Sequence, residues 1–136
     1  MAEITRITTP SLATQTPGNE CQRTGIKAGE VLAPGDLVYL KAADGRLWKA
    51  SGAAANAAAV VVGMVLIPAQ VGEGTTYYFG VTVNYASGTL TPGALLYLSG
   101  TVAGGLADAA STGGTKPIAY VAQDGARIVL ANDMWR

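Results

Sequence analysis

Apolar residues occur along this chain in short runs, and residues that favour turns separate these runs. Most runs are rich in Val, Leu, Tyr and Thr, which favour strands, and no amphipathic helix of useful length is indicated. The alanine-rich stretch Ala53–Ala59 allows one or two helical turns by propensity. Frequent short strands predict an all-β fold, a compact β-barrel or a sandwich. We expect strands at Leu37–Leu40, Leu47–Ala50, Val60–Leu66, Thr75–Val83, Leu95–Leu98, Ile118–Gln123 and Arg127–Leu130.

Two Asp-Gly pairs mark hairpins within this pattern. Asp44-Gly45 separates the first two expected strands, and Asp124-Gly125 separates the last two. Asp-Gly is typical of the primed two-residue turns whose twist matches that of the flanking strands. We therefore expect primed turns at both sites.

An internal repeat relates two parts of the chain. The segment Leu32–Leu40 reads LAPGDLVYL and the segment Leu90–Leu98 reads LTPGALLYL, so six of nine positions are identical. Each segment is followed by a loop of small residues and then by another β segment. The repeat predicts two similar β-hairpin units that pack into one core. Two copies are too few for a solenoid.

The first part of the chain, residues 1–28, differs from the rest. Prolines and glycines are so dense there that they argue against a packed element. We interpret residues 1–28 as an extended N-terminal arm and residues 29–136 as the β-barrel domain. Ile4, Ile7 and Leu12 gain nothing by staying in water, so we expect them to contact a neighbouring molecule.

The charge pattern narrows the partners. Nine basic and nine acidic residues cancel, and charged residues make up 13% of the chain, about half the usual share. The basic residues form no cluster, which argues against a nucleic-acid partner. The longest uncharged apolar stretch, Ala57–Ala69, is too short for a membrane-spanning helix, and Met1–Pro10 lacks the pattern of a signal peptide. We expect assembly in a cytoplasm, without contact with a membrane.

The residue types needed for catalysis are scarce. The chain has no histidine, which removes the common catalytic triads and most zinc sites. Its single cysteine, Cys21, has Arg23 as its sole basic neighbour nearby. The glycine-rich stretches lack the spacing of a phosphate-binding loop. We expect no enzymatic activity, no cofactor and no metal site.

An apolar pair, Met134 and Trp135, lies just before the last residue, Arg136. A terminal tryptophan is seldom left in solvent, because its ring is large and apolar. It either folds back on the core or docks on a neighbouring subunit, and the sequence leaves both alternatives open.

Three segments carry a resemblance to a known family. The hairpin Leu90–Leu98, the loop Gly104–Asp108 and the final strand Ala126–Leu130 resemble segments of the small structural proteins of tailed-bacteriophage heads, in particular capsid decoration or cement proteins. The resemblance covers about residues 29–130. It implies a β-barrel that forms homo-oligomers, often trimers, on the outer capsid surface. It also implies an N-terminal arm that extends over neighbouring subunits.

The resemblance therefore predicts a virion protein that stabilises a capsid by bridging neighbouring major capsid subunits, after assembly in the host cytoplasm. A head-fibre base or a tail or baseplate module is an alternative, because related hairpin segments occur there too. A carbohydrate-binding β domain is a further alternative, which exposed Trp and Tyr side chains in one groove would support.

Overall fold

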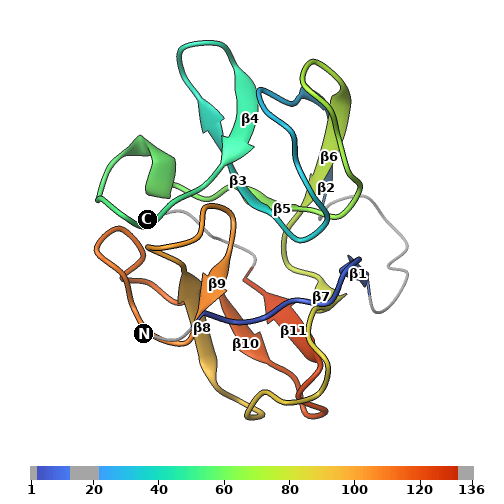
Figure 1. Cartoon of the computed structure of the whole chain (residues 1–136), viewed down its shortest axis with the longest axis vertical. Coiled ribbons are helices and arrows are strands. Elements are labelled where there is room, and N and C mark those ends of the chain that lie inside the picture. The colour runs from blue at the N-terminus through green and yellow to red at the C-terminus, as the bar shows by residue number, and fades with distance from the viewer. Residues whose placement is uncertain (1–2, 13–21, 132–136) are drawn as a thin grey trace.

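The computed structural model shows an all-β protein made of two antiparallel sheets that pack together (Figure 1). It describes residues 3–12 and 22–131. One sheet has the strand order β2-β6-β5-β3-β4 and the other has the order β1-β7-β11-β10-β8-β9. The all-β fold predicted from the sequence is confirmed, and two packed sheets correspond to its sandwich form. The strands are β1 Ser11–Leu12, β2 Gln22–Lys27, β3 Leu37–Lys41, β4 Arg46–Lys49, β5 Gly63–Val65, β6 Gly74–Tyr78, β7 Thr82–Asn84, β8 Leu95–Leu98, β9 Leu106–Ala107, β10 Ala119–Val121 and β11 Arg127–Leu130.

The two sheets are two copies of one unit. Repeat 1 consists of β2–β6 and repeat 2 consists of β7–β11. Both have the same order of equivalent strands, and β1 is added at the edge of repeat 2. The residue pairing also corresponds, because Leu37 pairs with Met64 in repeat 1 as Leu95 pairs with Tyr120 in repeat 2. The internal repeat predicted from the sequence is thus present in the register of the strands.

The Pro-Gly turns show the same equivalence in their hydrogen bonds. The Gly35 N–H donates to the Val65 carbonyl at 2.7 Å, and the Gly93 N–H donates to the Val121 carbonyl at 2.8 Å. Both glycines have a positive φ, +93° and +81°, which a residue with a side chain adopts only with strain. The identical Pro-Gly sequences therefore form the same turn in both repeats.

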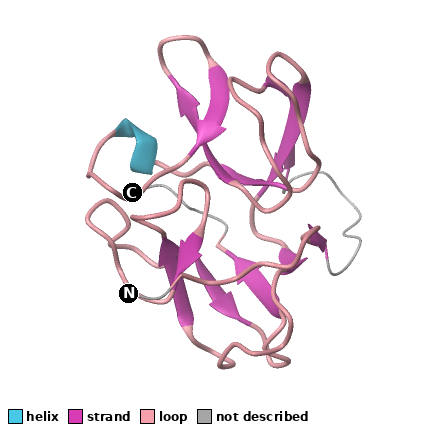
Figure 2. Ribbon diagram, viewed as in Figure 1, coloured by secondary structure: helices cyan, strands magenta, loops and turns pink. Residues whose placement is uncertain are grey.

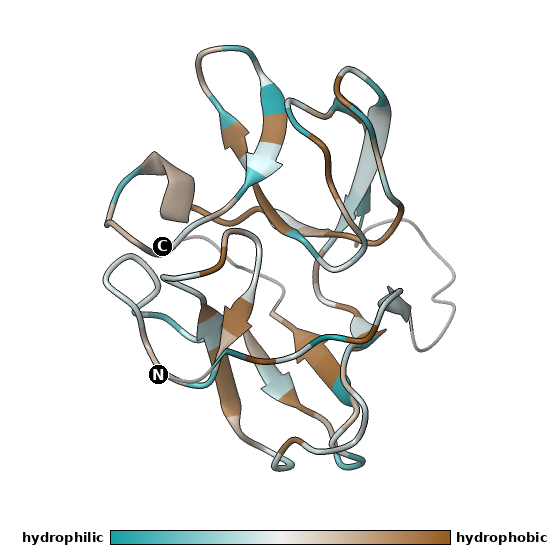
Figure 3. Ribbon diagram, viewed as in Figure 1, coloured by the Kyte–Doolittle hydropathy of each residue, from teal (hydrophilic) through white to brown (hydrophobic). Residues whose placement is uncertain are grey.

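The apolar core has two parts, because the sheet of repeat 1 is buried on both faces. Alternate residues of a strand point to opposite faces. Val38 and Val65 pack with Leu32 in a smaller cluster inside repeat 1. Their neighbours in the chain, Leu37 and Met64, belong to the larger cluster shared with repeat 2. The apolar segments of β8, β9 and β11, which line this shared core, are brown in Figure 3.

Several expected strands differ in extent from the prediction. The segment predicted as one strand over Thr75–Val83 is divided into β6 and β7, which belong to different sheets. The division lies at Gly80, where φ is +65° and the N–H donates to the Ala131 carbonyl. The strand predicted over Val60–Leu66 is reduced to β5, with Val60 exposed.

The helical prediction for Ala53–Ala59 is confirmed in part. A 3₁₀ turn, η1, forms at Ala57–Ala59 and is drawn as the cyan helix in Figure 2. The Asn56 side chain caps it by accepting from the Ala58 N–H at 3.0 Å.

The prediction of primed turns at the Asp-Gly pairs is wrong. A type I′ turn requires a positive φ at both central residues, but among the described residues only glycines have one. Gly45 closes a longer loop between the paired residues Lys41 and Arg46. The Asp44 carboxylate accepts from the Arg46 N–H at 3.0 Å, so Asp44 stabilises the loop through its side chain.

The arm predicted at residues 1–28 also needs correction. Gln22–Lys27 form β2, which pairs with β6 in the sheet of repeat 1. The register shifts between Thr24 and Ile26, where Gly25 has a φ of +88°. A β-bulge therefore accommodates the glycine that made this segment resemble a loop. The β domain thus begins before residue 29.

The equivalent glycines Gly35 and Gly93 provide a matched test of the fold. Alanine at either position meets the strain of a positive φ, which costs about 1–2 kcal/mol. At Gly93 an added Cβ has open space, whereas at Gly35 it would lie 2.8 Å from Pro10 Cγ and 2.7 Å from the Arg6 guanidinium. We expect Gly35→Ala to lower the free energy of unfolding more than Gly93→Ala. Urea unfolding of both variants measures this, and equal losses would contradict the packing of Pro10 on Gly35.

Candidate functional site

The N-terminal segment, residues 3–12, lies on its own domain. Glu3 forms a β-bridge with Ala107, and the Ile4 N–H donates to the Leu106 carbonyl at 3.0 Å. Farther along, β1 pairs with β7 and extends the sheet of repeat 2 (Figure 1). The described part of the predicted arm is therefore fastened to this chain and does not extend away from it.

The structure places the three predicted arm contacts as follows. Ile4 is partly buried against the shared core, and Ile7 is half-buried with its N–H donating to the Tyr85 carbonyl at 2.6 Å. Leu12 pairs with Val83 in the sheet. Contact of these residues with a neighbouring subunit or a capsid stays a prediction. The predicted docking residues Met134 and Trp135 lie outside the described residues, as does Cys21.

Arg6 anchors the segment to repeat 1. Its guanidinium forms a salt bridge of 2.8 Å with the Asp36 carboxylate and donates to the Pro34 carbonyl at 2.8 Å. Asp36 is almost fully buried and also accepts from the Ala33 N–H. In repeat 2 the equivalent residue is Ala94, whose side chain has no carboxylate to pair with an arginine. The N-terminal segment thus forms its ion pair with a carboxylate that repeat 2 lacks at the equivalent position.

Glu3 anchors the same segment to repeat 2. Its carboxylate accepts from the Ser99 hydroxyl at 2.5 Å and from the Thr101 hydroxyl at 3.1 Å. Ser99 is buried and its hydroxyl also accepts from the Val102 N–H. The N-terminal segment therefore joins both repeats through polar contacts at two points.

Tyr85 lies buried beside this segment. Its hydroxyl has no hydrogen-bond partner among the described residues. Burial raises the pKa of this hydroxyl to about 12, because the charged phenolate is poorly solvated there. The Arg6 charge lowers the pKa to a smaller extent. With this pKa the side chain stays neutral at physiological pH and is unsuited to act as a base.

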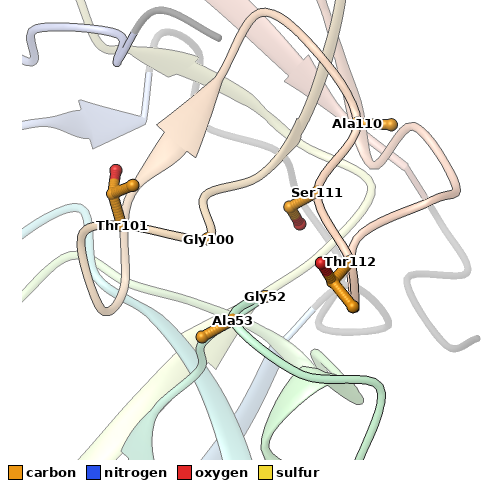
Figure 4. Close-up of a pocket in the computed structure, with 7 residues that line it drawn as sticks. All are labelled: Gly52, Ala53, Gly100, Thr101, Ala110, Ser111 and Thr112. Atoms are coloured by element: carbon orange, nitrogen blue, oxygen red, sulfur yellow. The ribbon is translucent and has the colours of Figure 1, made fainter.

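Two of the surface pockets are lined wholly by described residues. One, of about 320 Å³, is lined by small residues of both repeats: Gly52, Ala53, Gly100, Thr101, Ala110, Ser111 and Thr112 (Figure 4). The Ser111 hydroxyl there donates to the Leu98 carbonyl at 2.8 Å, so it maintains the loop. The other pocket, of about 290 Å³, lies beside Ile4 and Leu90. Neither pocket is lined by an aromatic side chain, as a sugar-binding groove commonly is.

The aromatic side chains of repeat 1 contact residues of their own chain. The Trp48 indole N–H donates to the Asp44 carboxylate at 3.1 Å, and the Lys41 ammonium lies 4.1 Å from the ring centroid. The Arg23 guanidinium lies 5.5 Å from the Phe79 ring centroid. Cation–π contacts of this kind hold the rings in place at the surface.

Within residues 3–12 and 22–131, no group of three His, Cys, Asp or Glu side chains is arranged to hold a metal ion. No helix in that part of the chain has the length and apolarity required to cross a membrane.

The described residues include two exposed apolar patches that bear on function. The loop patch consists of Val31, Ile67 and Val71, which are exposed by 52%, 59% and 59%. These residues lie on two loops that a reciprocal bridge between Leu32 and Ala69 holds side by side. The second patch is on the sheet of repeat 2, where the paired residues Leu95 and Tyr120 are both about half exposed. The sequence did not predict either patch, because an apolar sequence alone does not show which of its residues other parts of the chain cover.

A scan against protein-family models finds no match to this chain, and a search of curated proteins finds no relative.

The Arg6–Asp36 pair leads to a stability prediction. Replacing Arg6 by Ala leaves the buried Asp36 carboxylate without its counter-charge, and we expect the free energy of unfolding to fall by about 2–3 kcal/mol. The double variant Arg6→Ala/Asp36→Ala removes the stranded charge and matches the alanine of repeat 2. We expect it to be more stable than Arg6→Ala alone, by urea unfolding. A double variant less stable than the single one would contradict this account of the pair.

Tyr85 leads to a pH prediction. In the unfolded chain its hydroxyl ionises near pH 10, whereas in the folded protein it ionises near pH 12. The resulting stabilisation is fully present below pH 10 and is lost as the pH rises from 10 to 12. We expect Tyr85→Phe to remove this loss, roughly 2–3 kcal/mol, and to leave stability at pH 7 unchanged or higher.

Urea midpoints measured at pH 8 and pH 11 test this expectation. Tyr120→Phe is the matched control, because it makes the same chemical change at an exposed position. If Tyr85→Phe and Tyr120→Phe respond to pH in the same way, burial of Tyr85 does not control the alkaline transition.

Proposed function

We propose that this chain is a structural virion protein of a tailed bacteriophage. In this proposal it binds the outer surface of the capsid and stabilises it by bridging neighbouring major capsid subunits. It acts as a homo-oligomer, with a trimer favoured, and reaches the virion after assembly in the host cytoplasm. It requires no cofactor and performs no catalysis.

The observation that carries the proposal is the loop patch. Val31, Ile67 and Val71 are exposed on loops that backbone hydrogen bonds hold in place, so the patch needs little ordering before it binds. The centre of a protein–protein interface is apolar and poor in charge. A preformed apolar surface of this kind suits a protein partner such as the major capsid protein.

The resemblance to phage head proteins supports the same proposal. Of its three segments, Leu90–Leu98 supplies the Pro-Gly turn and strand β8, and Ala126–Leu130 supplies strand β11. These segments build the framework of repeat 2. The scarcity of charge on the chain also favours a role in an assembly, since few charges oppose association.

A head-fibre base or a tail or baseplate module is the alternative within the same class of particle proteins. Such a module would also bind its partner through the exposed apolar surfaces, but the partner would be a different part of the particle. A carbohydrate-binding domain is less favoured, because the two pockets lack aromatic side chains and Trp48 is engaged by Lys41 and Asp44.

Co-sedimentation with expanded heads of the phage that carries this sequence tests the proposal. We expect the wild-type chain to pellet with the heads, and Ile67→Lys and Val71→Lys to weaken this binding by about tenfold or more each. A lysine in the centre of an apolar interface must be desolvated without a partner, which costs affinity.

Val102→Lys is the control, because Val102 is also an exposed valine, on another loop. It should bind as the wild type does. Failure of the wild-type chain to pellet with expanded heads would contradict the proposal. Binding to purified tails or fibres instead would support the alternative module.

A further inference from the structure

The outer faces of the two repeats are equivalent in register and differ in burial. The outer face of a repeat is the side of its sheet that points away from the core inside that repeat. In repeat 1 this face carries Leu37 and Met64, and both are fully buried. In repeat 2 the equivalent pair is Leu95 and Tyr120, which are exposed by 50% and 48%. One outer face is covered and its counterpart is not.

Repeat 2 itself covers the outer face of repeat 1, through its β8–β9 hairpin. The Leu37 N–H donates to the carbonyl of Gly104 in that hairpin at 2.9 Å, and the Gly104 N–H donates to the Ala50 carbonyl at 2.7 Å. The Gly52 N–H also donates to the Ser99 carbonyl. Leu98, which pairs with Leu106 in the same hairpin, is buried in the shared core.

The equivalent hairpin of repeat 1, β3–β4, has no such partner among the described residues. Leu40 pairs with Leu47 as Leu98 pairs with Leu106, but Leu40 is 51% exposed whereas Leu98 is 1% exposed. In Figure 1 this hairpin points away from repeat 2, at the far end of the molecule. The contact between the repeats thus joins a hairpin of one repeat to the outer face of the other. Among the described residues, the β3–β4 hairpin and the outer face of repeat 2 do not take part in such a contact.

We propose that copies of this chain associate head to tail, with the β3–β4 hairpin of one copy packed on the outer face of repeat 2 of the next. The intermolecular contact repeats the contact that already joins repeat 1 to repeat 2 inside the chain. It covers Leu95 and Tyr120 as Leu37 and Met64 are covered, and it covers Leu40 as Leu98 is covered. A contact between two different surfaces closes into a ring when the rotation allows it.

The inference rests on the homo-oligomer in the proposed function but does not require the capsid. The loop patch that we assign to the capsid belongs to repeat 1 and consists of other residues. Self-association and capsid binding can therefore be tested and lost separately.

Light scattering on the purified full chain and two variants tests the proposal. We expect the wild type to form a defined oligomer. Leu95→Arg removes the receiving face and Leu40→Arg removes the hairpin, so each variant alone should be monomeric. A mixture of the two should form a dimer and nothing larger, because the intact hairpin of Leu95→Arg fits the intact face of Leu40→Arg.

Val60→Arg is the control, since it places the same charge at an exposed position outside the β3–β4 hairpin, the outer face of repeat 2 and the loop patch, and it should keep the wild-type mass. Thermal unfolding shows whether each variant is folded, and Leu95→Ser and Leu40→Ser replace any arginine variant that is not. A monomeric wild type would overturn the proposal. So would an oligomer that survives Leu95→Arg, or a loss caused by Leu95→Arg that Leu40→Arg neither shares nor rescues.

Discussion

The structure depends on the need to bury both faces of the sheet in repeat 1. Strands β3 and β5 each present consecutive apolar residues, Leu37-Val38 and Met64-Val65, and alternation sends them to opposite sides. The loops of repeat 1 cover one side. Burying the other side requires a second layer, which repeat 2 supplies. The packing of the two repeats therefore follows from the strand pattern of the first.

The N-terminal segment strengthens this packing in a way that the duplication alone does not provide. Its Arg6 binds Asp36 of repeat 1, while its Glu3 binds Ser99 of repeat 2. Two residues of a single short segment thus hold both repeats, and Tyr85 is buried beside it. Because repeat 2 has Ala94 at the position of Asp36, the segment distinguishes two units that share one backbone plan. This asymmetry means that the ion pair with Arg6 is available in repeat 1 alone.

Much of the fold could be predicted from the sequence, because its strongest signals are local. Strands β8 and β11 form from apolar runs, and the Pro-Gly repeat forms turns, as these local sequence patterns predict. The missed features depend on contacts distant in sequence. Gln22–Lys27 form a strand because β6 pairs with them, and the chain breaks at Gly80 because it passes there from one sheet to the other.

The candidate surfaces were harder to predict for the same reason. Ile4 and Ile7 were correctly recognised as residues that do not stay in water, but the described segment finds cover on its own domain. The exposure of Leu95 and Tyr120 could not be predicted, since their equivalents Leu37 and Met64 lie in similarly apolar strands and are buried. The difference arises from which side the other repeat occupies. Only the three-dimensional arrangement of the repeats contains that information.

The division of surfaces bears on how such a protein would act in an assembly. Two of the exposed apolar surfaces among the described residues lie on different repeats. One surface, on repeat 2, has the form of a contact that the chain already makes internally. The other, on the loops of repeat 1, has no internal counterpart and suits a different protein. An oligomer joined through the first surface presents several copies of the second at once. Each contact with a capsid can then be weak while the assembly stays bound, because linked sites rebind before all of them separate.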